Sequence, residues 1–321
     1  MSKATKIWLI AATVLLLLGI MLFATAMTAT GWKFTTLNTA PYETNEHTVS
    51  EEFHNIFIEA DTADVRLLPS PDGACRVVCY EQKKTRHEVA VVDSTLTIRT
   101  IDEREWYEYI GISFDKPSVT IYLPQDAYSV LTVEESTGDV TIPDGFIFTT
   151  VSIQTSTGDV TLRASASGAV KIKTSTGDIL AEDISVNALD LTVSTGRVAV
   201  SSVTCSGDLS VMVSTGDAQL TDTVCGEFSS TGDTGDITLR NVTVNGRLSI
   251  ERSTGDVHFD GSDADSLWIK TSTGDVTGTL RSEKIFITST DTGKIKVPSS
   301  LHGNRCDITT DTGNILLDIQ P

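Results

Sequence analysis

Four aspartates of this chain, Asp217, Asp236, Asp256 and Asp275, recur every 19 or 20 residues, and each directly follows a Thr-Gly pair. Carboxylate oxygens are ligands that Ca²⁺ prefers, so a stacked column of these side chains is a candidate metal site. Known Ca²⁺-binding β-helices carry a Gly-Gly-x-Gly-x-Asp nonapeptide, which this sequence lacks. The favoured interpretation is that each carboxylate accepts hydrogen bonds from backbone N–H groups of its own turn. We predict no metal and no cofactor, with the calcium column as the alternative.

The triplet Asp-Thr-Gly, which carries the catalytic carboxylate of aspartic proteases, occurs at Asp233, Asp291 and Asp311. Those enzymes need two carboxylates about 3 Å apart that share one proton, whereas here Asp replaces Ser at one position of a repeat. The five histidines show no metal-ligand or nucleophile-base spacing, and the sequence has neither a Gly-x-Ser-x-Gly elbow nor a phosphate-binding loop. These observations predict that the chain is not an enzyme.

The repeat that contains the aspartates is a pentad, Ser/Asp-Thr-Gly-x-aliphatic, which occurs ten times at intervals of 19 or 20 residues. A unit this short cannot bury an apolar face alone, so successive copies must stack as coils of a solenoid. Glycine at one coil position supplies a positive φ or a close backbone approach that a Cβ would prevent. The predicted structural corner consists of Gly138, Gly158, Gly177, Gly196, Gly216, Gly235, Gly255, Gly274, Gly293 and Gly313.

Aliphatic residues alternate on both sides of each corner. In the first copy, Val140 and Ile142 follow the glycine, Leu131 and Val133 precede it, and most other copies repeat this pattern. Residues two apart on a strand share a face, so two strands per coil direct these side chains inward. By the same parity, Trp268 points outward. We predict an all-β fold, a parallel β-solenoid of about ten coils of 19–20 residues, preceded by an N-terminal β capping region and one transmembrane helix.

The predicted transmembrane helix covers residues 7–29, an uncharged apolar run that is long enough to cross a bilayer. Lys3 and Lys6 precede this run and only Lys33 follows it closely, so the positive-inside rule places the amino terminus in the cytoplasm and the repeats outside. The alternative is a cleaved signal peptide, because Ala24-Thr25-Ala26 resembles a small-x-small cleavage site. Both interpretations export the repeats. The predicted organisation is 1–6 cytoplasmic tail, 7–29 signal anchor, 30–50 linker, 51–130 capping region and 131–321 solenoid repeats.

Within the capping region, residues 61–67 form a degenerate repeat with Ala63 at the glycine position. Residues 89–99 and 118–123 largely alternate apolar and polar side chains, which predicts two half-buried strands. The intervening segment Glu103–Gly111 breaks the alternation and carries aromatic residues, among them Trp106 and Tyr109. Two interpretations are open: the segment is a binding loop, or the aromatic rings fold over the open end of the core.

The net charge and the cysteine positions bear on the partners of the chain and on its disulfides. The net charge of −19 argues against nucleic acid as a partner. Cys205 and Cys225 each follow a repeat glycine by nine residues in adjacent coils, so a disulfide between them is left open. Cys306 falls in an inward column, where we expect a small buried apolar side chain.

The export segment, the degenerate repeat, the strand SVTIYLP at 118–124 and the Ser-Thr-Gly-Asp-Val series resemble the bacterial putative-adhesin family built of β-strand repeats. The resemblance covers about residues 50–319. It implies a β-solenoid that is associated with the cell envelope, and it supplies no catalytic residues. Members that resemble this chain include accessory proteins of envelope-stress signalling.

The predicted function is a non-enzymatic, adhesin-like binding or structural module of the cell envelope. The predicted localisation is the cell membrane, crossed once, with the repeats on the extracytoplasmic side. The expected partners are the membrane, through the N-terminal helix, and an envelope protein or glycan. The alternative is an accessory regulator or sensor of envelope stress that binds a membrane signalling partner.

Overall fold

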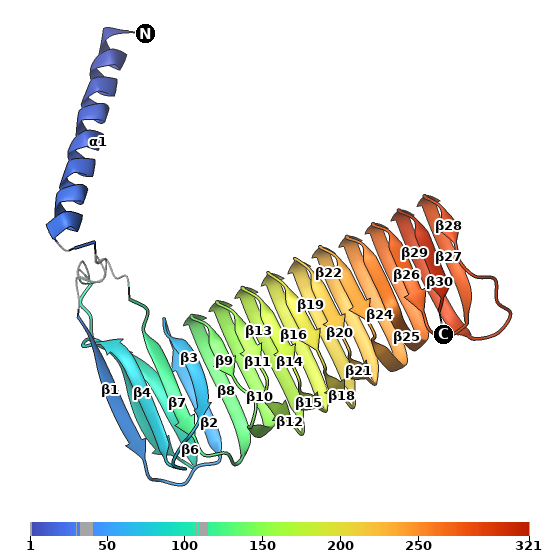
Figure 1. The fold of residues 1–321 in the computed structure, drawn as a ribbon, viewed down its shortest axis with the longest axis horizontal. Helices are drawn as coiled ribbons and strands as arrows, with labels where there is room; N and C mark the ends of the chain where they lie inside the picture. Colours follow the sequence, from blue (N-terminus) through green and yellow to red (C-terminus); the bar gives the residue numbers. More distant parts are fainter. Residues whose placement is uncertain (1, 30, 33–40, 107, 109–114, 321) are drawn as a thin grey trace.

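The computed structural model describes residues 2–29, 31–32, 41–106, 108 and 115–320 (Figure 1). At the amino-terminal end, α1 (Lys3–Ala29) is one helix, and its part Thr5–Ala29 is long and apolar enough to cross a membrane. Leu15 and Leu22 on this helix are 69% and 70% exposed. A membrane span and an uncleaved signal sequence both require such a helix. The rest of the described chain is built of strands and their connections (Figure 1).

Strands of successive coils pair in parallel and form ladders along the axis of the solenoid (Figure 1). The first ladder contains β8 (Ala127–Thr137), β10 (Ile147–Thr157), β13 (Ala169–Thr176), β16 (Ala188–Thr195), β19 (Asp208–Thr215), β22 (Glu227–Thr234), β24 (Thr243–Thr254) and the end of β25 (Val257–Thr273). The second contains β9 (Val140–Ile142), β11 (Val160–Leu162), β14 (Ile179–Glu182), β17 (Val198–Ser201), β20 (Ala218–Thr221), β23 (Ile237–Arg240), the start of β25 and β26 (Val276–Leu280). The predicted parallel β-solenoid is confirmed.

A third, short side closes most coils, in addition to the two strands that the sequence predicted. It contains β12 (Ser165–Ala166), β15 (Ser185–Val186), β18 (Thr204–Cys205) and β21 (Val224–Cys225), and it continues into β24. Ile184 and Val203 on this side are each 1% exposed, as deeply buried as the predicted inward residues Val140 and Leu131. The core is therefore one continuous apolar column that is enclosed on three sides.

The last two coils stack in the reverse of their order in the chain. β29 (Asn304–Thr312) lies between β25 and β27 (Lys284–Thr292), and β30 (Ile315–Ile319) lies between β26 and β28 (Ile295–Lys296) (Figure 1). Residues 284–297 therefore form the outermost coil. Thr288 in this coil stands opposite the buried Ile308 of its neighbour. At this inward position the outermost coil carries the more polar side chain, although its Ile285, Ile287 and Ile295 are 43%, 52% and 45% exposed.

The opposite end is closed by a cap of parallel and antiparallel strands. β2 (Asn55–Ala60) and β3 (Asp64–Pro69) pair with β8 and β9, so the degenerate repeat around Ala63 is the first coil of the stack. Outside it lie β6 (Thr95–Asp102) and β7 (Ser118–Leu123). The antiparallel strands β5 (Thr85–Val92), β4 (Cys75–Gln82) and β1 (Tyr42–Val49) complete the cap.

Two predictions for the cap are wrong. Residues 89–99 are not one strand: the chain reverses at Asp93 and Ser94, whose φ of 48° and 58° are typical of a two-residue hairpin. Strand β1 lies within residues 30–50, which were predicted as a linker. Its inward positions include Asn45 and His47, both half-buried, and such polar side chains hide the alternation from a hydropathy pattern.

The aromatic segment between β6 and β7 is described only in part. Trp106 is 76% exposed, so its ring does not cover the core. Tyr109 lies outside the described residues.

Candidate functional site

The corner of the coil is a column of glycines that pack backbone against backbone. Nine of the ten have φ between 129° and 159°, a range that residues with a Cβ rarely adopt. A Cβ on Gly235 would overlap the carbonyl oxygen of Gly216 and lie 2.5 Å from its carbonyl carbon. Gly293, in the outermost coil, lies outside this φ range, but a Cβ there would lie 2.6 Å from the carbonyl carbon of Gly313. Close approach between coils therefore requires glycine at the corner.

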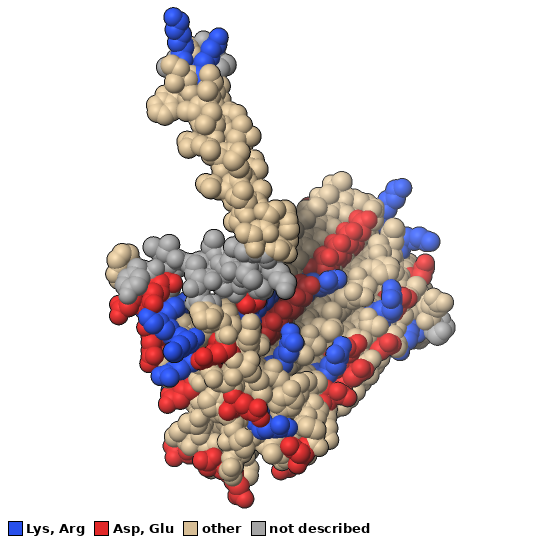
Figure 2. All heavy atoms as spheres, turned by 60° about the vertical axis from the view of Figure 1, so that its left-hand side comes forward, with Lys and Arg blue, Asp and Glu red and all other residues tan. Residues whose placement is uncertain are grey.

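Beside the glycines, the aspartate column is a hydrogen-bonded ladder between coils. Oδ1 of Asp217 accepts the backbone N–H of Asp236 (2.9 Å), Oδ1 of Asp236 accepts that of Asp256 (2.8 Å), and Oδ1 of Asp256 accepts that of Asp275 (2.7 Å). These donors were predicted to lie in the aspartate's own turn, and this prediction is wrong. The strict register brings residues 19 or 20 apart side by side, so each carboxylate bonds the next coil. Figure 2 shows acidic side chains in a row along one edge of the solenoid.

One cation interrupts this ladder. The backbone N–H of Arg197 donates to Oδ1 of Asp178 (2.7 Å), and its guanidinium pairs with Oδ2 of the same residue (3.2 Å). Carboxylates one coil apart repel by about 1 kcal/mol per pair in water. Arg197 offsets this repulsion at Asp178, and the backbone N–H groups offset it along the rest of the column.

We expect thermal stability to depend little on Ca²⁺, because one oxygen of each aspartate in the run from Asp217 to Asp256 already accepts a backbone N–H. A ligand at about 100 times its dissociation constant would raise the free energy of unfolding by about 2.7 kcal/mol. Melting the protein in EDTA and in millimolar Ca²⁺ measures this directly, with the double variant D236N/D256N as control. A large calcium-dependent rise in Tm that is lost in the variant would make the column a metal site.

A buried acid that the sequence analysis missed lies in the first coil. Glu135 is 5% exposed, and its Oε1 accepts the backbone N–H groups of Ala63 (3.2 Å) and Thr137 (3.3 Å). Its Oε2 has no hydrogen-bond partner among the described residues. Burial, with a smaller contribution from the charges of Asp61 and Asp64, raises the pKa of Glu135 to about 8. The detectable signal is an acidic residue at an inward position, three residues before the corner glycine, where five of the other nine repeats have threonine.

A buried arginine occupies the same coil position further along the solenoid, three residues before the corner glycine. Arg252 is 2% exposed, and its guanidinium donates to the carbonyl oxygen of Val213 (3.3 Å) and to Oγ of Ser230 (2.9 Å). The preceding coil has Gly232 at this column, and a Cβ there would overlap the guanidinium. Gly232 and Arg252 are therefore a matched pair, and they lie between Val213 and Thr271 at the same position of the neighbouring coils.

The outward face of the first ladder carries a shallow hollow beside an aromatic ring. The hollow has a volume of about 260 Å³ and is lined by Asp208, Leu209, Glu227, Phe228, Ser229, Arg247 and Ser249. The guanidinium of Arg247 lies 5.8 Å from the ring centroid of Trp268. Trp268 is half-buried between the inward residues Leu267 and Ile269, which confirms that it faces outward. This face combines a flat apolar ring with charged and hydroxyl groups.

The cysteines are all buried and free. Cys205 and Cys225 occupy the third side of adjacent coils, where the disulfide that the sequence left open is not formed. Burial raises the pKa of the Cys225 thiol to about 12, so it is unreactive at neutral pH. Cys306 is 0% exposed in its inward column.

The family described as Toastrack DUF4097 matches residues 53–224 and 206–321. Among solved structures, the chain is similar to a protein named a putative adhesin from Parabacteroides distasonis ATCC 8503, with 11% identity and a TM-score of 0.50 over 87% of this chain and 98% of that chain. A second, named a putative adhesin from Parabacteroides merdae ATCC 43184, has 13% identity and a TM-score of 0.47 over 87% and 97%.

A third solved structure is named a putative lipid binding protein and also comes from Parabacteroides distasonis ATCC 8503. It has 17% identity and a TM-score of 0.47 over 75% of this chain and 95% of that chain. No curated protein matches the chain. The first similarity shows a shared fold.

Proposed function

Because the chain belongs to the Toastrack DUF4097 family, we propose that it is a non-enzymatic, adhesin-like binding or structural module of the bacterial cell envelope. The observation that carries this proposal is a β-solenoid preceded by an exposed apolar helix. A rigid stack of coils presents repeated outward faces to solvent, and the chain that leads into it begins with an exposed apolar helix (Figure 1). Repeat proteins commonly bind their partners on the extended, regular faces of such a stack.

The helix α1 holds the solenoid to the membrane on its extracytoplasmic side. The large apolar side chains from Ile7 to Phe23 are exposed, as a bilayer-facing helix requires. Lys3 and Lys6 lie on its amino-terminal side, which the positive-inside rule assigns to the cytoplasm. The solenoid itself carries the acidic residues, and the anionic surface of a bilayer would repel it. The rod is therefore expected to extend away from the membrane.

The face around Trp268 and Arg247 is the surface that we assign to binding. Tryptophan and arginine are enriched among the residues that dominate binding energy. Trp268 offers an apolar plane, and the adjoining hollow offers Asp208, Glu227 and Arg247 as hydrogen-bonding groups. An apolar plane beside polar groups fits the alternating C–H and hydroxyl surfaces of an envelope glycan. The solved structure named a putative adhesin from Parabacteroides distasonis ATCC 8503 shares this fold.

We expect the double variant W268A/R247A to lose at least about tenfold in affinity for isolated cell-wall glycan, because each side chain has the character of a binding hot spot. The measurement is cosedimentation of the purified full chain with the glycan. Met212→Ala is the matched control, since Met212 is 48% exposed on the same ladder but does not line the hollow.

Equal binding by the double variant and the wild type would overturn this assignment. In-cell photocrosslinking from the Ser249 position, which lines the hollow and stands opposite Trp268, separates the two functional classes. Adducts with glycan support the adhesin-like module. Adducts confined to a membrane protein would replace it with the accessory regulator or sensor of envelope stress.

A further inference from the structure

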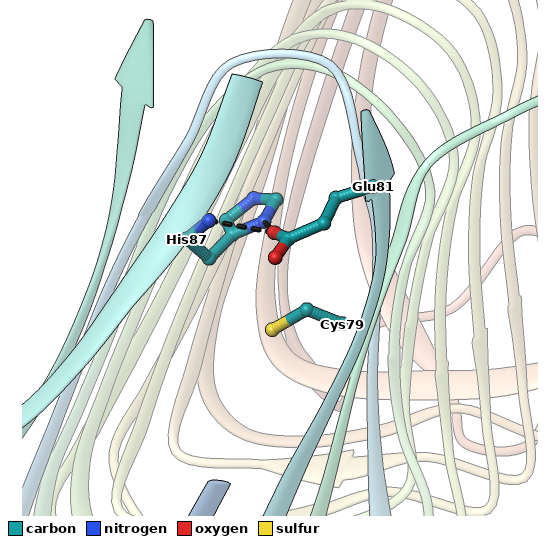
Figure 3. Close-up of side chains that lie close together, drawn as sticks. All are labelled: Cys79, Glu81 and His87. Atoms are coloured by element: carbon teal, nitrogen blue, oxygen red, sulfur yellow. Dashed lines mark hydrogen bonds and ion pairs between the residues drawn. The ribbon is translucent and has the colours of Figure 1, made fainter. Parts of the chain in front are cut away.

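Three chemically active side chains meet inside the N-terminal cap, away from the solenoid faces. Cys79 and Glu81 lie on β4 and His87 lies on β5. The two strands pair only at Gln82 and Thr85 and then diverge into opposite sides of the cap. The inward side chains near this hairpin therefore face one another across the end of the core (Figure 3).

All three side chains are withdrawn from solvent, with exposures of 0% for Cys79, 1% for Glu81 and 5% for His87. One ligand atom from each lies within 4.8 Å of the others. His87 Nδ1 is 2.7 Å from Oε2 of Glu81, and Asn45 Nδ2 donates to Oε1 of Glu81 (2.7 Å). A buried carboxylate and imidazole destabilise a fold unless their polar atoms are satisfied. Nε2 of His87 is buried and has no hydrogen-bond partner among the described residues.

We propose that Cys79, Glu81 and His87 bind one divalent transition-metal ion of the Zn²⁺ class. A thiolate sulfur, an imidazole nitrogen and a carboxylate oxygen are the ligand types that zinc takes from proteins, and three protein ligands leave a fourth position for water. A thiolate and a carboxylate together carry two negative charges, which a divalent ion balances. Asn45 then acts as an outer partner that fixes the orientation of Glu81, as is usual around metal ligands.

The cavity beside the cluster is of a size that suits an ion and water rather than an organic substrate. A cavity of about 250 Å³ reaches His87 and is also lined by Tyr42 and Thr100. This volume is small for an organic ligand.

The test uses the full chain in detergent, stripped of metal with a chelator and then titrated with Co²⁺. We expect one Co²⁺ per chain and a thiolate-to-cobalt charge-transfer band that one equivalent of Zn²⁺ removes. C79S should lose the band, and N45A should weaken binding about tenfold or more. E81Q, which keeps an acceptor for Asn45, provides a second ligand variant and should also lose tight binding.

Cys75→Ser is the matched control, because Cys75 is a buried free thiol on the same face of β4 but lies outside the cluster. This variant should keep the band and the stoichiometry. Circular dichroism without metal confirms that each variant is folded. The proposal is overturned if the wild type shows no thiolate band with Co²⁺, or if folded C79S or E81Q binds Co²⁺ as tightly as the wild type.

Discussion

Replacing Gly235 with alanine is expected to lower the free energy of unfolding by about 2 to 6 kcal/mol. The added Cβ would overlap the carbonyl oxygen of Gly216, and φ at this position is 129°. The backbone cannot move away freely, because the N–H of Gly235 donates to the carbonyl oxygen of Thr254 in the next coil (3.0 Å). Urea denaturation followed by circular dichroism measures the loss.

Gly261→Ala separates backbone strain from the clash between coils. Gly261 has φ of 58°, but no heavy atom of the described residues lies within 4 Å of its added Cβ. Its substitution should therefore lower the free energy of unfolding by only about 1 to 2 kcal/mol, the penalty for holding alanine in the left-handed conformation. Equal losses in the two variants, or an unchanged midpoint for Gly235→Ala, would show that the corner does not require glycine for close packing.

Replacing Glu135 with glutamine is expected to remove a large pH dependence of stability. The pKa of Glu135 is raised from 4.5 to about 8 in the folded chain, chiefly by burial. Below pH 4.5 the side chain is protonated in both the folded and the unfolded chain. Between pH 4.5 and about 8 only the folded chain keeps the proton, so the free energy of unfolding falls as pH rises through this window. The total loss is roughly 4 to 5 kcal/mol.

Glu135→Gln should therefore match the wild type near pH 4.5 and be more stable near pH 8. Glutamine keeps the oxygen that accepts the N–H groups of Ala63 and Thr137. Glu134→Gln is the control, because Glu134 is the exposed neighbour of Glu135 on the same strand and should leave the pH dependence unchanged. Parallel pH profiles for the wild type and Glu135→Gln would show that the buried carboxyl does not titrate in this window.

The repeat predicted the coil well because each recurring position has one main requirement, either close backbone approach at the corner or an apolar side chain in the core. Glycine at the corner and aliphatic residues at Val140 and Leu131 recur with a fixed spacing, and only stacked coils satisfy both. The third side of the coil was missed because its strands are only two residues long in β12, β15, β18 and β21. Such short stretches carry too few alternations to define a period.

The order of the last coils and the buried polar side chains could not be inferred in the same way. All coils share the same corner and spacing, so stacking Gly274 on Gly293 or on Gly313 looks equivalent in the sequence. Thr288, at an inward position where the neighbouring coil has Ile308, is a weak signal that its coil lies at the end. The cluster of Cys79, Glu81 and His87 depends on two strands that diverge after a hairpin, and sequence spacing alone does not show this divergence.

Protease treatment of spheroplasts or protoplasts tests most directly whether the solenoid is held to the membrane on its extracytoplasmic side. The chain carries an epitope tag at its carboxyl terminus, and the membrane fraction is analysed before and after treatment. We expect the tag to be digested without lysis, and mass spectrometry of the untreated membrane protein to find residues 7–29 still attached. A tag that stays protected until lysis, or a chain released with an amino terminus near Met27, would contradict the proposed membrane-held module.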